Sequence, residues 1–272
     1  MTEMLINGVP ASRLPADDRG LLYGDGLFET IAFYGGSSPL WPLHMDRLGR
    51  GCAVLDLPVP NPGVLLEEAR RLIAARGREV VRITLTRGSG GRAYFPPEPV
   101  SPNRILMRQE FPNDLEDQWQ HGIRAVTSPI VLEGPPMLAG LKHLNRLAQV
   151  QIARHCHGKG AREALVADRH GRLVEALTGN LVVVRDSRML TPAAHDAAVA
   201  GVGLAWLKEQ VGTALEAVEL PVAALGPEDE IWVINSVSGI RPVSRLDGLV
   251  RPIGSACRAW QERWQQLIGT PS

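Results

Sequence analysis

Three short apolar segments follow one another closely in the second half of the chain, and they constrain the fold more than any other feature. These segments are Ala164–Ala167, Leu173–Ala176 and Leu181–Val184. Asp168-Arg169-His170-Gly171, between the first two, has the composition of a tight turn. Apolar segments of this length, bounded by turn residues, are typical of β-strands. The second half is therefore predicted to contain a run of strands joined by tight turns.

The remaining periodic segments add helices and strands to both halves. In the first half we expect a hairpin turn at Asn7-Gly8, strands over Met4–Ile6, Phe28–Tyr34, Val80–Thr86 and Arg104–Gln109, and helices over Leu43–Leu55 and Val64–Arg76. In the second half we expect strands over Ile123–Ser128 and Ile231–Asn235, a helix ending near His157, and helices over Val199–Val211 and Ser255–Leu267. This mixture predicts the α+β fold class.

A polar segment over Phe111–His121 divides the chain. It contains Pro112 and lacks a strong apolar period, so we interpret it as a connection between domains. The predicted domains are an N-terminal α/β lobe over residues 1–112, a connecting loop over 113–121 and a C-terminal lobe over 122–272. Two such lobes predict a ligand site where they meet.

Composition excludes several classes of function. The 272 residues carry 29 basic and 29 acidic side chains, so the net charge of zero argues against a nucleic-acid or anionic-membrane surface. No apolar run approaches the roughly 18 residues that a membrane span needs, and the N-terminus lacks the features of a signal peptide. Three scattered cysteines predict a cytoplasmic protein without disulfides. His155-Cys156-His157 does not predict a metal site, because adjacent helical residues point in different directions.

Lys142 is the first candidate for chemistry. It lies in a glycine-led segment before a helix, among Leu138, Leu141, Leu144 and Leu147, so we expect its ammonium to be partly desolvated. Desolvation lowers the pKa of a lysine, and the neutral amine is a nucleophile that forms imines with carbonyl groups. The alternative is a lysine whose stem lies along apolar surface while its head reaches water.

An imine-forming lysine commonly serves pyridoxal phosphate, whose pyridine nitrogen needs an acidic partner. Glu175 ends the strand Leu173–Ala176 and is the candidate for that partner, because a nearby carboxylate keeps the nitrogen protonated. A strand-end glutamate facing water is the alternative.

Candidates for holding the phosphate lie in three places. Gly201-Val202-Gly203 opens a predicted helix, whose free N–H groups bind phosphate. Asn235-Ser236-Val237-Ser238-Gly239 follows an apolar strand and offers N–H and hydroxyl groups. Arg47 has the planar guanidinium that suits phosphate. An ordinary helix start, an ordinary turn and a solvated arginine are the alternatives.

A glycine-rich segment from Arg87 to Tyr94 contains two arginines. It does not match a P-loop, which requires Gly-Lys-Ser/Thr after the glycines. Arg87 and Arg92 suit a substrate with carboxylates, because guanidinium groups bind carboxylates through paired hydrogen bonds. The alternative is a mobile surface loop with exposed arginines.

Taken together, these segments resemble the fold-type IV pyridoxal phosphate enzymes, which include branched-chain aminotransferases, D-amino-acid aminotransferases and aminodeoxychorismate lyases. The resemblance covers nearly the whole chain, and its elements occur in family order: Leu5–Gly8, Tyr23–Thr30, His44–Leu48, the lysine segment, Glu175 with Asn180-Leu181, Thr191-Pro192, Gly201-Val202 and Asn235–Val243. It implies a smaller N-terminal α/β lobe, a larger C-terminal lobe with a barrel-like sheet, bound pyridoxal 5'-phosphate and a homodimer.

Within this group the chain is most similar to the aminodeoxychorismate lyases, on three features: Gly140–Leu147, Arg87–Tyr94 and Thr30. That similarity implies the conversion of 4-amino-4-deoxychorismate to 4-aminobenzoate and pyruvate, with no metal. It also implies that Lys142 holds the cofactor and moves a proton, and that Glu175 pairs with the ring nitrogen. By the same similarity, the phosphate is held by Arg47, Gly201, Val202, Ser236 and Val237. The substrate is expected to contact Arg92, Tyr94 and Arg87, and Thr30 is expected to relay a proton to the departing enolpyruvate.

Two residues depart from the lyase pattern, and two other functions stay open. Ala93 replaces a loop glycine, and Leu204 stands where many members have arginine. A D-amino-acid or branched-chain aminotransferase would use the same cofactor, and a non-catalytic binding protein could keep the fold.

Overall fold

The computed structural model describes residues 3–193 and 197–269. The chain divides into two compact units, Met1–Phe111 with Leu141–Asn145, and Pro112–Gly140 with Arg146–Ser272. Two details differ from the sequence-based expectation. Most of the expected connecting loop is helix α4 (Leu115–His121), which buries Leu115 and Trp119 in the second unit. The segment around Lys142 belongs to the first unit although it follows strand β6 (Ile123–Thr127) in the chain.

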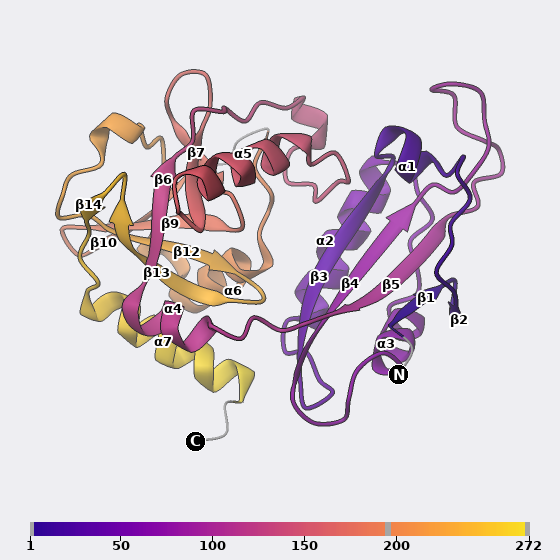
Figure 1. Ribbon diagram of the computed structural model, residues 1–272, viewed down its shortest axis with the longest axis horizontal. Helices are drawn as coiled ribbons and strands as arrows, with labels where there is room; N and C mark the ends of the chain where they lie inside the picture. The colour runs from indigo at the N-terminus through magenta and orange to yellow at the C-terminus, as the bar shows by residue number, and fades with distance from the viewer. Residues whose placement is uncertain (1–2, 194–196, 270–272) are drawn as a thin grey trace. The chain divides into compact units, whose positions relative to one another are not determined.

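The N-terminal unit is an antiparallel sheet with helices packed on it (Figure 1). The five strands have the order β2-β1-β5-β4-β3, so β3 is an edge strand. Their bounds, with those of the three helices, are β1 Met4–Ile6, β2 Val9–Pro10, β3 Gly26–Tyr34, β4 Arg78–Thr86, β5 Asn103–Gln109, α1 Arg19–Tyr23, α2 Trp41–Val54 and α3 Pro62–Arg70. The predicted hairpin turn at Asn7-Gly8 is confirmed, with β1 and β2 paired on either side of it.

Alternation along β3 sets which residues face helix α2. Leu27, Glu29, Ile31 and Phe33 are almost fully buried, and α2 packs against this strand. A Cβ at Gly51 of α2 would lie 2.7 Å from Leu27 Cδ1, so glycine is what permits this close approach. Phe28 and Thr30 consequently point to the other face of the sheet.

The C-terminal unit is a nine-stranded mixed sheet with helices around it (Figure 1). Its main order is β11-β10-β9-β12-β13-β6-β7-β8, with β14 paired to β13. The bounds are β6 Ile123–Thr127, β7 Glu163–Ala167, β8 Leu173–Ala176, β9 Asn180–Arg185, β10 Arg188–Pro192, β11 Leu215–Val218, β12 Glu230–Asn235, β13 Gly239–Leu246, β14 Leu249–Val250, α5 Leu147–Gly158, α6 Val202–Val211 and α7 Ser255–Ile268. Three short 3-10 turns cover Pro136–Leu138, Gly212–Ala214 and Val222–Ala224.

This second sheet curls, because terminal strand β8 comes back beside β9 and β10. Leu173 N at the start of β8 donates to Leu220 O, which follows β11 at the opposite end. Leu165, Leu181, Val183 and Val233 belong to the apolar core that the curled sheet encloses. The α+β fold with a barrel-like C-terminal sheet is thereby confirmed.

Most predicted elements form within a few residues of their expected bounds. The helix expected over Val64–Arg76 is shorter, because α3 ends at Arg70 and Leu72 already belongs to a turn. The helix expected from Val199 begins at Val202, after Gly201 at its N-cap. Within the described part of the chain, no helix has both the length and the apolar character that crossing a bilayer requires.

Candidate functional site

The segment that carries Lys142 adds to the free edge of β3. Phe28 N donates to Lys142 O at 2.9 Å, and Leu144 N donates to Gly26 O at 3.0 Å. These hydrogen bonds hold the lysine backbone rigidly against the strand. Leu141 is buried, but Leu147 is 72% exposed, so the expectation that four leucines surround the lysine is wrong for that residue. Leu147 is the first residue of α5, and its side chain faces solvent there.

An aromatic ring lies under the lysine head. Lys142 Nζ is 4.6 Å from the centroid of the Phe28 ring, and Arg82 Cζ is 3.9 Å from the same centroid. Both contacts have cation–π geometry. Thr30 lies directly opposite Arg82 in the β3–β4 ladder, so Phe28, Thr30 and Arg82 share one face of the sheet.

The sequence reasoning missed Arg82. Burial lowers the pKa of its guanidinium, and within the described residues no carboxylate pairs with it. A partly buried cation without an acidic partner is suited to binding an anionic group of a ligand. The only sequence indication was a charged residue in the middle of the apolar strand Val80–Thr86.

A buried charge cluster lies on the opposite face of β3. Glu29 accepts from Arg47 Nε at 2.8 Å and from Arg47 Nη2 at 2.5 Å, and His44 Nδ1 lies 2.6 Å from Glu29 Oε2. Burial raises the pKa of Glu29, but the Arg47 charge and the two hydrogen-bond partners outweigh it and bring the pKa down to about 2. Burial lowers the pKa of His44, so its neutral ring donates from Nδ1 to the ionised carboxylate.

Arg47 therefore uses Nε and Nη2 on Glu29, which holds the guanidinium in one orientation. Arg47 lies at the middle of α2 and is only 6% exposed, so it is not a solvated surface residue. The role of Arg47 in phosphate binding stays a prediction.

In the C-terminal unit, Glu175 is buried with 5% exposure, which excludes the alternative of a glutamate facing water. Val199 N donates to Glu175 Oε2 at 2.9 Å, and Asn180 Nδ2 donates to Val199 O at 3.0 Å. The backbone at Val199 is thus held between a strand-end carboxylate and a side-chain amide. This contact orients Glu175.

The two segments predicted to hold a phosphate meet in the same unit. A Cβ at Gly203 would lie 2.9 Å from the carbonyl carbon of Asn235, so the first turn of α6 packs directly on the turn that follows β12. A Cβ at Gly201 would lie 1.7 Å from Asn180 Oδ1, which brings α6 beside the Glu175 cluster.

Among the described residues, no side chain caps the first turn of α6. Uncapped N–H groups at a helix start attract anions. Asn235 Oδ1 accepts from Val237 N at 3.0 Å and from Ser238 N at 2.7 Å, so the turn that presents Ser236 and Val237 is firmly held. Gly201, Val202, Ser236 and Val237 thus lie on two adjoining turns, and their role in holding a phosphate stays a prediction.

Arg87 is the clearest revision of the predicted site. It is 8% exposed, donates from Nε to Asp25 Oδ2 at 2.8 Å, and donates from its terminal nitrogens to Leu55 O and Asp56 O. Each of its three nitrogens donates to the protein itself, so Arg87 is a structural residue of this loop and we do not assign it a substrate contact. The glycine-rich motif predicted a loop but could not indicate which acidic residue would approach its first arginine.

Arg92 and Tyr94 lie in the exposed loop between β4 and β5 (Figure 1), and Tyr94 is 82% exposed. Arg19 holds this loop, because its guanidinium donates to Ala93 O at 2.9 Å and to Tyr94 O at 3.1 Å. Ala93 has a φ of 51°, the left-handed region in which glycine is favoured. The substrate roles of Arg92 and Tyr94 stay predictions.

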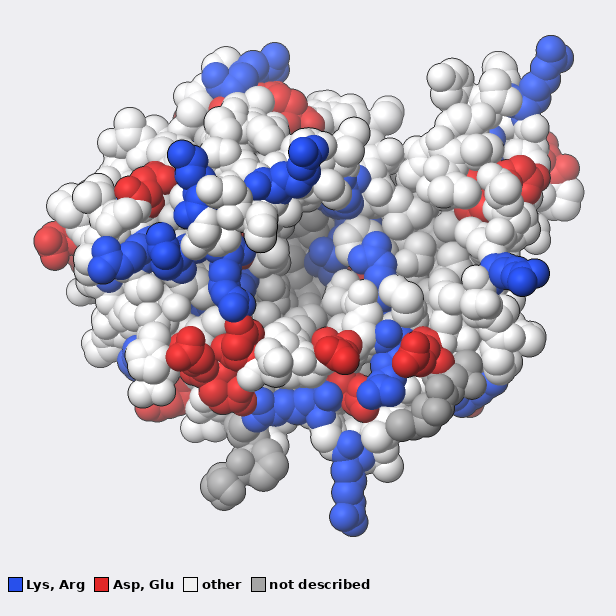
Figure 2. All heavy atoms as spheres, in the orientation of Figure 1, with Lys and Arg blue, Asp and Glu red and all other residues white. Residues whose placement is uncertain are grey.

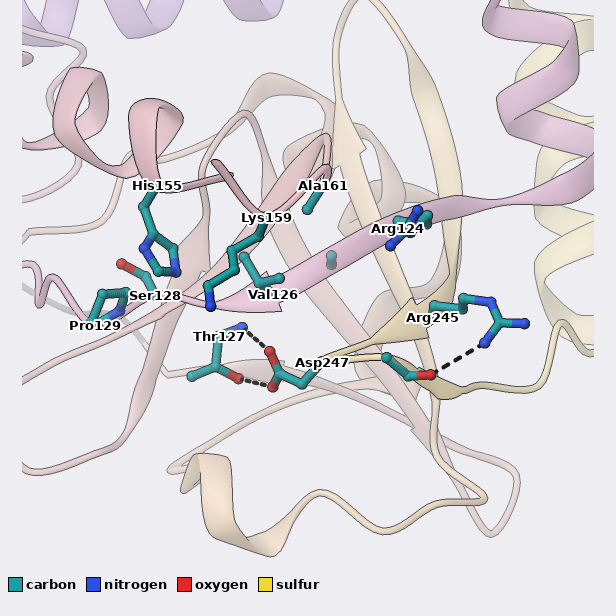
Figure 3. Close-up of a pocket in the computed structure, with 12 residues that line it drawn as sticks. Arg124, Val126, Thr127, Ser128, Pro129, His155, Lys159, Ala161, Arg245 and Asp247 are labelled. Carbon is teal, nitrogen blue, oxygen red and sulfur yellow. Dashed lines mark hydrogen bonds between the residues drawn. The ribbon is translucent and has the colours of Figure 1, made fainter. Parts of the chain in front are cut away.

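A separate pocket of about 530 Å³ lies in the C-terminal unit between β6, the end of α5 and the β13–β14 turn (Figure 3). Arg124, His155, Lys159 and Arg245 line it, and Asp247 there accepts from Thr127 N and Oγ1. None of the predicted site residues lines this pocket.

Within the described residues, neither the surface charges nor the potential metal ligands indicate a second functional site. Basic and acidic side chains both occur on the visible face of each unit (Figure 2), in keeping with the net charge of zero. The described residues include no cluster of three or more His, Cys, Asp or Glu side chains that could hold a metal ion.

The lysine segment at the edge of β3, the strand-end carboxylate and the adjoining turns at Gly201 and Ser236 lie on a fold that defines a known class. The chain belongs to the amino-transferase class IV family, whose model matches residues 26–246.

Two relatives place it more narrowly. It is 29% identical to the aminodeoxychorismate lyase of Vibrio harveyi over 264 residues, which covers 94% of this chain and 97% of that enzyme. It is 39% identical to the 4-amino-4-deoxychorismate lyase of Pseudomonas aeruginosa, with a TM-score of 0.89 and coverage of 97% of this chain and 98% of that one. The branched-chain amino acid aminotransferase of Escherichia coli shares the fold at 21% identity, with a TM-score of 0.87 and coverage of 98% and 94%.

Proposed function

We propose that this protein is an aminodeoxychorismate lyase that converts 4-amino-4-deoxychorismate to 4-aminobenzoate and pyruvate. The observation that carries the proposal is the full-length likeness to the Pseudomonas aeruginosa lyase at 39% identity. We propose that it acts as a homodimer in the cytoplasm, in the folate pathway.

The cofactor of this proposal is pyridoxal 5'-phosphate, which supplies an electron-withdrawing ring when it is bound. Glu175 would face the ring nitrogen, because it is a buried carboxylate already oriented by Val199 N. The cradle of Gly201, Val202, Ser236 and Val237 would hold the phosphate. Arg47 would add a guanidinium whose direction Glu29 sets.

Residues of the N-terminal unit would bind the cofactor covalently and transfer protons. Lys142 binds the cofactor and takes the proton from the substrate carbon that bears the amino group. Phe28 limits where the lysine head can move, since Nζ lies over its ring. Thr30 shares the face of Phe28 and is our candidate for passing a proton to the departing enolpyruvate.

Product formation tests the proposal directly. The purified protein is supplied with chorismate, glutamine and the enzyme that aminates chorismate, and 4-aminobenzoate and pyruvate are measured. We expect equal amounts of both products. If the protein instead transfers amino groups from D-alanine or leucine to 2-oxoglutarate and forms no 4-aminobenzoate, it is an aminotransferase. A protein that takes up no cofactor and forms neither product would be a binding protein on this fold.

Arg82 is our proposed contact for a substrate carboxylate. Arg82→Gln should raise the KM for 4-amino-4-deoxychorismate by about 10- to 100-fold, because a hydrogen bond to a charged group contributes about 1.5–3 kcal/mol. Arg92→Gln should raise the KM as well if the exposed loop also contacts substrate. Steady-state kinetics of 4-aminobenzoate formation measure both effects.

Arg78→Gln is the matched control for these variants. Arg78 is on the same strand and face as Arg82, but its guanidinium lies 5.8 Å from the Phe111 ring centroid. Its KM should stay at the wild-type value. Wild-type kinetics for Arg82→Gln would remove Arg82 from the substrate site, and the same result would remove Arg92.

A further inference from the structure

A buried ion pair lies behind the proposed phosphate cradle, outside the groups assigned to cofactor or substrate. Glu163 in β7 is fully buried, and Arg241 in β13 is 6% exposed. Arg241 Nη2 lies 3.1 Å from Glu163 Oε2, and Arg241 Nη1 donates to Gln118 Oε1 at 3.3 Å.

Both members of this pair converge on Thr178, in the turn between β8 and β9. Glu163 accepts from Thr178 N at 3.0 Å and from Thr178 Oγ1 at 2.5 Å. Arg241 Nη2 donates to the same hydroxyl oxygen at 2.8 Å. The hydroxyl therefore donates to one charge and accepts from the other, which defines its position and that of the turn.

Thr178 is connected to the proposed phosphate-binding turn through Asn235. Its carbonyl accepts from Asn235 Nδ2 at 3.0 Å. The other end of the Asn235 amide, Oδ1, accepts from Val237 N and Ser238 N. The orientation of the amide thus links the Thr178 carbonyl to the backbone of the turn that presents Ser236 and Val237.

Stability alone is a weak reason for such a pair. Desolvation of two buried charges commonly offsets their attraction, so apolar residues would stabilise this position equally well. An apolar pair could not direct two hydrogen bonds at one hydroxyl group. The directional contacts on Thr178 are what the charges provide.

We propose that Glu163 and Arg241 are positioning residues that act through Thr178 and Asn235 to hold the turn that binds the phosphate of the cofactor. The inference rests on the proposed function, in which Ser236 and Val237 hold that phosphate. It predicts that loss of the Thr178 hydroxyl weakens binding of the phosphorylated cofactor and leaves recognition of the unphosphorylated ring intact.

The test uses Thr178→Val, which removes the hydroxyl at a surface turn and keeps the shape of the side chain. Apoprotein is titrated with pyridoxal 5'-phosphate and, separately, with pyridoxal, and binding is followed by absorbance. We expect the Kd for pyridoxal 5'-phosphate to rise about 10- to 100-fold and the Kd for pyridoxal to change less than about twofold. Thr178→Ser, which keeps the hydroxyl, should bind both as the wild type does.

Thr127→Val is the matched control, because Thr127 Oγ1 donates to Asp247 Oδ2 at 2.7 Å in the separate pocket of the same unit. It should bind both compounds normally. Glu163→Gln is a second variant for the same chain of contacts and should also weaken pyridoxal 5'-phosphate selectively. Thermal unfolding of each apoprotein shows that the variants are folded.

Three results overturn the inference: an unchanged Kd for pyridoxal 5'-phosphate in folded Thr178→Val, an equal loss for both compounds, or no recovery in Thr178→Ser. These results differ from a failure of the proposed function. In that case the wild-type protein itself would bind no pyridoxal 5'-phosphate or would form no 4-aminobenzoate.

Discussion

Lys142→Ala should lower the rate of 4-aminobenzoate formation by at least about a thousand-fold, because the variant lacks both the cofactor-binding amine and the proton-transfer group. Lys142→Arg should be similarly inactive, since its guanidinium keeps the cation beside Phe28 but does not deprotonate. Together the two variants separate a need for charge from a need for a neutral amine. The measurement is single-turnover product formation with saturating cofactor.

Both lysine variants should fold, because the hydrogen bonds that join this segment to β3 come from the backbone of Lys142 and Leu144. Lys159→Ala removes a lysine from the separate pocket and should keep the wild-type rate. Borohydride reduction of the wild type should leave a cofactor-sized mass increase on Lys142. A normal rate for Lys142→Ala, or a label on another lysine, would overturn the mechanism.

Glu29→Gln should lower the free energy of unfolding by about 3–5 kcal/mol at pH 7, because it removes the negative charge that is paired with the buried Arg47 guanidinium. Glutamine keeps the size of the side chain, so the loss reports the charge. Urea unfolding of the apoprotein measures it. Asp46→Asn is the matched control on the same helix, since the exposed Asp46–Arg50 pair should contribute less than about 1 kcal/mol.

In the wild-type protein, acid should remove the same stabilisation by protonating Glu29. The pKa of Glu29 is about 2 in the folded protein against an ordinary value of 4.5, so its stabilisation is fully present above pH 4.5. It is lost as the pH falls from 4.5 towards 2, because the unfolded state binds a proton there before the folded state does.

The resulting loss from this group is about 3 kcal/mol of unfolding free energy between pH 5 and pH 2. Other carboxylates titrate in the same range, so the informative quantity is the difference between wild type and Glu29→Gln. That difference should shrink as the pH falls. A difference that stays constant would show that the charge of Glu29 contributes nothing to stability.

Local patterns predicted most of the elements that carry the site. The apolar alternation of Val80–Thr86 predicted β4, and the strand over Leu173–Ala176 placed Glu175 at its end. The glycines at Gly201 and Gly203 predicted a helix start, which α6 provides. These predictions succeed because each depends on a few neighbouring residues and on backbone geometry.

Packing between distant segments explains the errors. The polar composition of residues 113–121 hid a helix that is stabilised by burying Leu115 and Trp119. Asp25 pairs with Arg87, whereas Arg82 contacts the Phe28 ring. No local pattern indicates these partners, because they lie far away along the chain.

By itself, the sequence determined the fold class, the chemical identity of the reactive groups and the strands and helices that present them. The tertiary structure alone decided that Lys142 joins the edge of β3, that His44 and Arg47 both contact Glu29, and that Glu163 and Arg241 hold Thr178, whose carbonyl binds Asn235. Residue spacing specifies periodicity within one element. Contacts between elements depend on how complementary surfaces pack and on which buried charges find partners.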